Sequence, residues 1–216
     1  MRITVGSRVF APSWTMTTAA LLFGSLFVTL GFWQWNRGVE RQSTWDAFAA
    51  RAEKVVDATE ADLAAINRIY NHEIEHGTAT WDTEPWTIEK RREWWAEHND
   101  PLQPVIVAED APGVVGFAYL TLMSKKHGWR FTREDTIYVD ERARGMGVGV
   151  ALMAAILDEA RAIGVRLVVA SISSENAVSI RLHERFGFEV MGTLRNAGYK
   201  FGEWLDTTYM QRDLWV

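Results

Sequence analysis

The sequence predicts an α/β (α+β) fold with one mixed, mostly antiparallel sheet flanked by helices, preceded by one N-terminal transmembrane helix. From Lys54 onward, short apolar runs alternate with longer runs whose apolar residues recur at helical spacing. Two apolar runs, PVIVAED and VVGFAYLTL, are joined by a turn at residues 111–113 and indicate an antiparallel hairpin. A long charge-free run precedes this part of the chain.

Two helices are expected around a loop that precedes the hairpin. The first follows a short strand, KVVDA, begins after the N-cap Thr59 with Asp62 three residues later, and ends at Gly77. Its apolar positions share one face: Leu63, Ile66, Ile69, Tyr70 and Ile74. The second helix is capped by Thr87 and ends before Pro101.

Beyond the hairpin, we expect a strand over residues 134–140, a glycine-rich turn and a helix over 147–163. A buried strand, RLVVASIS, a helix over 176–186 and two further strands complete the chain.

The composition restricts the possible functions. Of the 216 residues, 48% are hydrophobic and 24% are charged, which is a globular composition. The absence of cysteine excludes disulfides, zinc–thiolate sites and a cysteine nucleophile. A net charge of −5 gives no reason to expect a nucleic-acid partner.

The N-terminal part differs from the rest, so we expect a hydrophobic segment and linker at 1–50 and a folded domain at 51–216. The 28 residues between Arg8 and Arg37 carry no charge, and about 20 helical residues cross a bilayer core. Residues 10–36 are therefore predicted to span a membrane. A cleaved signal peptide is the alternative, but the A-x-A pattern at 47–49 lies too far beyond the apolar run for ordinary cleavage.

Residues 72–76, HEIEH, have the spacing of a zinc protease, which places two imidazoles on one helix face beside a glutamate. The longer zinc motif fails, because Ala79 and Asp82 stand where its glycine and third histidine belong. A later glutamate, such as Glu89 or Glu93, could still provide the third zinc ligand, but no other feature of a protease accompanies it. We interpret HEIEH as a surface-exposed histidine pair and expect no metal.

The glycine-rich turn carries the clearest chemical signal. In ERARGMGVGVAL, Arg144, Gly147 and Gly149 form R-x-x-G-x-G at the start of an apolar helix. Glycines allow a ligand to approach the backbone closely, and the first helical turn offers N–H groups to a pyrophosphate. A dinucleotide-binding turn is the alternative, but the preceding hairpin and the lack of a ribose-binding acid after the next strand oppose it.

A second motif, SSENAVSIRLHERFGF, follows about thirty residues later. It places Asn176, Ser179 and His183 on one face of a helix that ends at Gly187. Taken alone, His183 would be interpreted as a core histidine that is hydrogen-bonded to the backbone. Together, the two motifs resemble the GNAT superfamily of N-acetyltransferases, in its phosphinothricin acetyltransferase-like branch, over residues 53–216. Ser179 and His183 stand where the superfamily motif N-x-x-A-x-x-x-Y-x-x-x-G-F has Ala and Tyr.

This resemblance implies direct attack of an amine on acetyl-CoA, the co-substrate. Glu134 is implied as the general base, with a solvated strand-end carboxylate as the alternative, and His183 as the second catalytic residue. Asp135 would point to the opposite sheet face. The Val139 N–H is the implied donor to the oxyanion. The implied coenzyme-binding residues are Ile137, Tyr138, Val139, Arg142, Arg144, Gly145, Met146, Gly147, Val148, Gly149, Asn176 and Ser179.

The resemblance also has implications for the acceptor substrate and for the oligomeric state. The implied acceptor-side residues are Trp81, Tyr119, Trp129 and Tyr199, although core packing suits Trp81 nearly as well. AYLTLMSKKHGW departs from the branch near the acceptor pocket. The resemblance therefore leaves several acceptors open: phosphinothricin, another small α-amino acid, methionine sulfone and methionine sulfoximine. A homodimer is implied. An acyl-CoA-binding sensor or an inert membrane-anchored member is the alternative function.

Residues 12–41 resemble the first membrane helix of the surfeit-locus cytochrome oxidase assembly proteins, and nothing after residue 50 continues that family. Because acetyl-CoA is a charged cytosolic molecule, we expect a cytoplasmic catalytic domain tethered to the inner (plasma) membrane by this helix. A gene fusion or a start codon assigned too early would instead place the functional start near residue 50.

Overall fold

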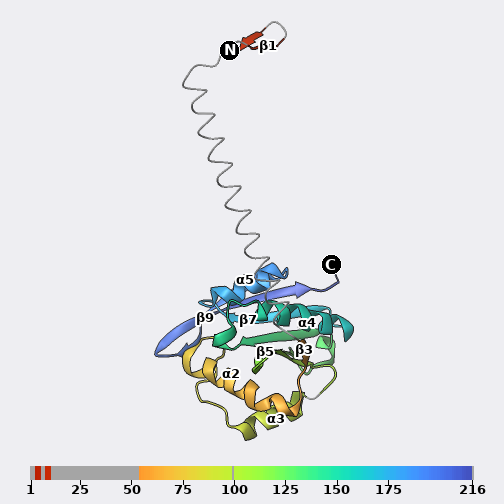
Figure 1. The fold of residues 1–216 in the computed structure, drawn as a ribbon, viewed down its shortest axis with the longest axis vertical. Coiled ribbons are helices and arrows are strands. Elements are labelled where there is room, and N and C mark those ends of the chain that lie inside the picture. Colours follow the sequence, from red (N-terminus) through yellow and green to blue (C-terminus); the bar gives the residue numbers. More distant parts are fainter. Residues whose placement is uncertain (1–2, 6–7, 11–53, 99, 216) are drawn as a thin grey trace. The chain divides into compact units, whose positions relative to one another are not determined.

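The computed structural model describes residues 3–5, 8–10, 54–98 and 100–215, which belong to two units, Met1–Ala47 and Phe48–Val216 (Figure 1). In the first unit, β1 (Ile3–Val5) pairs with β2 (Arg8–Phe10) in an antiparallel ribbon. The sequence patterns did not predict these strands.

The expected membrane span at 10–36 falls almost wholly outside the described residues. Its first residue, Phe10, ends β2. In the part of the chain that the structure describes, no helix combines the length and apolarity needed to cross a membrane.

The second unit is built on a seven-stranded sheet with the order β3-β4-β5-β6-β7-β9-β8. The strands are β3 (Lys54–Asp57), β4 (Val105–Asp110), β5 (Gly113–Leu122), β6 (Thr132–Val139), β7 (Leu167–Ser173), β8 (Glu189–Lys200) and β9 (Glu203–Asp213). Only β6 and β7 are parallel neighbours. The predicted mixed, mostly antiparallel sheet and its β4–β5 hairpin are confirmed.

The α-helices of residues 54–215 cover the two faces of this sheet (Figure 1). They are α2 (Leu63–His76), α3 (Ile88–His98), α4 (Val148–Ala162) and α5 (Ala177–Arg185). In Figure 1, α4 and α5 lie on one side of the sheet and α2 and α3 on the other. Short 3-10 turns occupy η1 (Glu60–Asp62), η2 (His127–Trp129) and η3 (Glu141–Ala143).

The predicted cap of the first helix is present, but it closes a 3-10 turn. The Thr59 N–H donates to Asp62 Oδ2 at 2.7 Å, which completes a capping box around η1. The α-helix itself therefore begins at Leu63, and it ends at Gly77 as expected.

Each sheet face has its own apolar core. The α4 side buries Leu152, Met153 and Ile156 completely. The α2 side buries Ile66 and Phe117. Each such side chain contributes about 1.5–3 kcal/mol relative to exposure, so these two layers hold the helices on the sheet.

The α2-side core also contains a buried cation. Arg91 is 1% exposed, and its guanidinium lies 4.3–4.7 Å from the ring centroids of Tyr70, Trp86 and Trp94. Aromatic faces attract a desolvated cation by about 2 kcal/mol, so the three rings offset part of the cost of burying this charge.

The pairing of β6 with β7 is short, and this positions the site. Thr132–Glu134 pair in parallel with Leu167–Val169. Beyond Glu134, β6 is paired only with β5, and β7 only with β9. The two strands therefore separate at Glu134, and the separated end of β6 leads through η3 into the glycine-rich turn before α4.

Candidate active site

Glu134 lies where β6 and β7 separate. It is opposite Thr121 in β5 and Val169 in β7, the last pair of the parallel ladder. Alternation along β6 puts its side chain on the face of Tyr138, which packs in the α2-side core. Burial raises the pKa of the Glu134 carboxyl, and the negative charge of Asp135 raises it further. A half-buried carboxylate of raised pKa suits proton abstraction from an ammonium group.

Asp135 and His183 form a buried pair on the opposite face of β6. His183 Nε2 lies 3.1 Å from Asp135 Oδ2, and His183 Nδ1 lies 2.7 Å from the Ser179 carbonyl oxygen. Burial lowers the pKa of the His183 imidazole, but the hydrogen bond and charge of Asp135 outweigh burial and raise it. Both ring nitrogens are thus bonded inside the protein. The orientation expected for Asp135 is confirmed, but its pairing with His183 was not predicted.

The glycine-rich turn has the backbone that its sequence indicates. Gly145 and Gly147 adopt φ angles of +76° and +88°, in the left-handed region that favours glycine. Gly147 is the N-cap of α4 and provides no side-chain cap. The first N–H groups of this 15-residue helix therefore face the turn and can bind an anion. Met146 is exposed, whereas Val148 is buried in the core.

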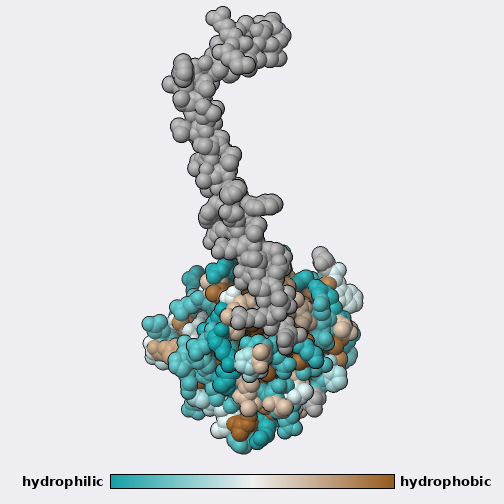
Figure 2. Space-filling model, viewed as in Figure 1, coloured by the Kyte–Doolittle hydropathy of each residue, from teal (hydrophilic) through white to brown (hydrophobic). Residues whose placement is uncertain are grey.

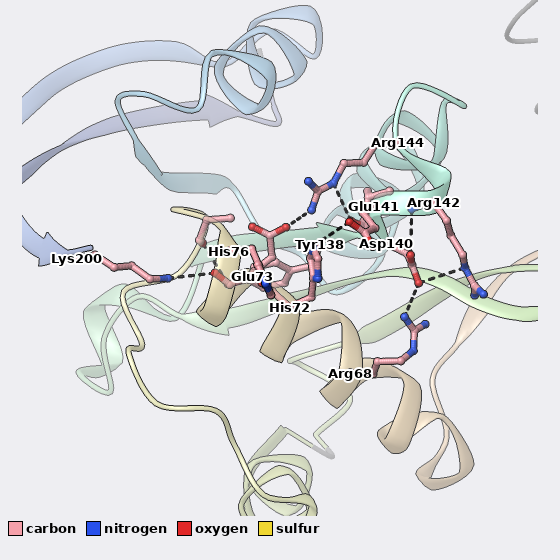
Figure 3. Close-up of polar contacts among 12 residues, drawn as sticks. Arg68, His72, Glu73, His76, Tyr138, Asp140, Glu141, Arg142, Arg144 and Lys200 are labelled. Carbon is pink, nitrogen blue, oxygen red and sulfur yellow. Dashed lines mark hydrogen bonds and ion pairs between the residues drawn. The ribbon is translucent and has the colours of Figure 1, made fainter. Parts of the chain in front are cut away.

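The arginines of this turn are held by carboxylates (Figure 3). Arg142 Nε lies 3.2 Å from Asp140 Oδ2, and Arg68 Nη1 of α2 lies 2.6 Å from the same oxygen. Burial acts to raise the pKa of Asp140, but the two arginines outweigh burial and lower it. Arg144 binds the Glu73 carboxylate of α2, and its Nε donates to the Val139 carbonyl at 3.4 Å.

The HEIEH residues contact this turn. Besides the Glu73–Arg144 pair, His72 Nε2 lies 3.3 Å from Glu141 Oε2, and the His72 and His76 rings stack at 4.7 Å (Figure 3). His76 is exposed as predicted, but His72 is half-buried. Within the described ranges, no three histidine, aspartate or glutamate side chains gather as metal ligands would.

Asn176 and Ser179 organise α5. The Asn176 side-chain oxygen accepts a hydrogen bond from the Ser179 N–H at 3.0 Å, which caps the helix. The Ser179 carbonyl then accepts from His183. Asn176 and Ser179 thus fix the start of α5 and the ring of His183, and their contact with the coenzyme stays a prediction.

Two predicted acceptor-side residues lie on adjoining segments. A Cβ added at Gly198 of β8 would lie 2.3 Å from the Trp81 ring, so this glycine allows Trp81 to pack against β8. Tyr199 of β8 packs against its partner Trp204 of β9, with ring centroids 5.2 Å apart. Trp81 and Tyr199 are thus both found at the β8–β9 hairpin.

The other two acceptor-side residues lie elsewhere. Tyr119 of β5 packs against Trp94 and Phe117 on the α2 side of the sheet. Trp129 in η2 is 45% exposed. Contact of all four residues with an acceptor stays a prediction.

Several site residues were missed by sequence reasoning. Glu73 was noticed only as part of a metal-like pattern, and Asp135 only by its orientation. Lys200 is 3% exposed and donates to the carbonyls of Glu73 and Thr80 at 3.1 and 2.9 Å. Neither Lys200 nor Arg68 has a local signal, because their partners lie far away in the sequence.

Comparison with known proteins identifies the family of this chain. The family model of the acetyltransferase (GNAT) domain matches residues 55–209. An L-methionine sulfoximine/L-methionine sulfone acetyltransferase of Pseudomonas aeruginosa is 42% identical over 159 residues, 73% of this chain and 92% of the relative. A phosphinothricin N-acetyltransferase of Streptomyces viridochromogenes is 39% identical over 166 residues, 76% and 88% of the two chains.

A solved structure shows the same fold around the coenzyme. The GNAT superfamily phosphinothricin acetyltransferase of Sinorhizobium meliloti, in complex with acetyl-CoA, has a TM-score of 0.72 and 35% identity, covering 74% of this chain and 87% of that one. The fold and the glycine-rich turn thus define an acyl-CoA-dependent acyltransferase. The chain belongs to the GNAT family of N-acetyltransferases.

Proposed function

We propose that the protein transfers the acetyl group of acetyl-CoA to the amino group of a small amino-acid-like acceptor, such as methionine sulfoximine, methionine sulfone or phosphinothricin. The observation that carries this proposal is Glu134, a half-buried carboxylate at the point where β6 and β7 separate. The activities for which the relatives are named supply the acceptor class.

The reaction follows from these groups. An amine is mostly protonated at neutral pH, and the Glu134 carboxylate takes its proton, directly or through water. The nitrogen then attacks the thioester carbonyl; a C–N bond forms, and the C–S bond breaks with its electron pair on sulfur. The Val139 N–H, in the part of β6 that is paired with β5 but not with β7, donates to the oxyanion. The nitrogen loses its second proton to the departing CoA sulfur as the amide forms, and Glu134 releases the first proton to solvent, so the products are the amide, CoA–SH and one proton.

His183 has a supporting role in this proposal. Before His183 could donate a proton to the CoA sulfur, it would have to break its hydrogen bond to Asp135 or to the Ser179 carbonyl. We therefore propose that His183 acts as the cationic partner of Asp135 and limits the negative charge beside Glu134.

A thiol-release assay with acetyl-CoA tests the function. We expect release to depend on methionine sulfone, methionine sulfoximine or phosphinothricin and to be at background with acetyl-CoA alone. Binding of acetyl-CoA in calorimetry with no turnover on any acceptor would instead favour the acyl-CoA sensor. The absence of both heat and turnover would contradict the proposal.

The proposed homodimer has a candidate surface. β8 is an edge strand of 12 residues, exposed along nearly its whole length, with apolar side chains at Val190, Met191 and Leu194 that are 53–58% exposed. A long apolar edge strand tends to associate with another chain. Sedimentation of residues 51–216, the proposed catalytic domain, is expected to give twice the monomer mass. Met191→Lys/Leu194→Lys should give the monomer mass, whereas an unchanged mass would place the interface elsewhere.

We also propose that the catalytic domain faces the cytoplasm, tethered to the inner membrane by residues 10–36. The support is the charge-free run and the cytosolic location of acetyl-CoA. Alkaline phosphatase fused after Val216 is expected to be inactive in a bacterial host, and activity would reverse the orientation. Recovery of the expressed protein in the soluble fraction would instead favour a gene fusion or a start codon assigned too early. The resemblance of residues 12–41 to surfeit-locus proteins supports an anchor at most.

A further inference from the structure

Glu73 of α2 is the residue that holds Arg144 of the glycine-rich turn (Figure 3). Its side chain is only 11% exposed, whereas the Arg144 side chain is 51% exposed. The carboxylate binds Arg144 Nη2, and the Val139 carbonyl accepts from Nε. A guanidinium has five donors in one plane, so Arg144 can bind a phosphate oxygen while it stays bonded to Glu73.

The surroundings of Glu73 indicate a built position. A Cβ at Gly77 would lie 2.0 Å from Glu73 Oε2, so the carboxylate occupies space that only a glycine leaves. The φ of Gly77 is −124°, a value that any residue adopts, so the backbone does not require glycine here. The buried Lys200 ammonium donates to the Glu73 carbonyl, which places a second cation beside the same residue.

We propose that Glu73 is a positioning residue for acetyl-CoA, which fixes the Arg144 guanidinium so that it meets the diphosphate together with the N–H groups of α4. This inference rests on the proposed function. It assigns to the glutamate of HEIEH a role in coenzyme recognition, in place of the metal-site chemistry that its spacing suggests.

Two effects of Glu73 oppose each other, and the structure indicates which is larger. Its negative charge repels a diphosphate, but this charge is paired with the Arg144 guanidinium, and the Lys200 ammonium is bonded to the carbonyl of the same residue. Without Glu73, a half-exposed arginine regains side-chain freedom that it must lose again when it binds. We therefore expect removal of Glu73 to weaken coenzyme binding.

Steady-state kinetics of the full chain test the proposal with two thioesters. S-acetylpantetheine has the thioester of acetyl-CoA but no diphosphate. Glu73→Gln is expected to raise KM for acetyl-CoA roughly tenfold, a change of about 1.4 kcal/mol, with kcat and the KM for S-acetylpantetheine unchanged. In an Arg144→Gln background, Glu73→Gln is expected to add less than about a twofold change, because the partner is gone.

Gly77→Ala provides a second test that preserves every charge. The added methyl group displaces the Glu73 carboxylate, so KM for acetyl-CoA should rise while that for S-acetylpantetheine does not. Glu75→Gln, at an exposed position of the same helix, is the matched control and should change neither. A lower KM for acetyl-CoA in Glu73→Gln would overturn positioning in favour of simple repulsion. An equal rise in KM for both thioesters would also overturn it, as would an unchanged KM in both Glu73→Gln and Gly77→Ala. If the wild-type protein shows no turnover, the proposed function is contradicted and not the role of Glu73.

Discussion

Replacement of Glu134 by glutamine is expected to lower kcat by a factor of about 10² to 10⁴, the usual contribution of a positioned general base. The amide is nearly isosteric but cannot accept the proton of the acceptor ammonium. KM for acetyl-CoA should change little, because the proposed coenzyme-binding groups follow Glu134 in the sequence, in β6, the turn before α4 and α5. Thiol release under saturating substrates measures the effect.

The pH dependence provides an independent check on Glu134. A base acts when deprotonated, and burial together with Asp135 raises the Glu134 pKa above its ordinary 4.5. The wild-type kcat/KM should therefore rise with pH through that raised pKa, and Glu134→Gln should lack this limb. Glu184→Gln, at an exposed position of α5, should retain rate and profile. An unchanged rate in Glu134→Gln would refute the assignment.

Among single substitutions in the site, loss of Asp135 or His183 is expected to lower the free energy of unfolding most. The two side chains are 0% and 4% exposed, and removal of one partner from a buried pair costs about 3–5 kcal/mol. Asp135→Ala and His183→Ala should each lower the free energy of unfolding by about this amount, as urea denaturation would show. The double variant should lose less than the sum of the two, because no unpaired charge stays buried.

The sign of the pH effect follows from the His183 pKa. Because Asp135 raises this pKa in the folded state, the stabilisation is complete below the ordinary value of 6.5 and declines as pH rises through the raised value. The difference in stability between wild type and His183→Ala should therefore be larger at pH 6 than at pH 9. His127→Gln, at an exposed histidine, should show no such dependence. A difference that is independent of pH would mean that packing alone accounts for it.

Patterns within short segments predicted most of the fold. The helical spacing from Leu63 to Ile74, the hairpin and the left-handed Gly187 that follows α5 depend on neighbouring residues, and all three are confirmed. The pairs that complete the site depend on distant residues. Asp135 and His183 are 48 positions apart, and Glu73 and Arg144 are 71 apart. No local rule relates such residues, because only the packing of α2 and α5 on opposite faces of the sheet brings each partner to β6 or to the turn that follows it.

The short ladder between β6 and β7 has a mechanical consequence. Three residue pairs join the strands β3–β6 to the strands β7–β9, whereas the ladders inside each group are antiparallel and all longer. The sheet is therefore weakest along a single seam, and Glu134, the proposed general base, lies at the end of that seam. A tilt of strands β3–β6 against strands β7–β9 would change the distance between Glu134 and a thioester bound in the opening between β6 and β7. The rigidity of the β6–β7 ladder therefore limits how accurately the amine and the thioester can be aligned.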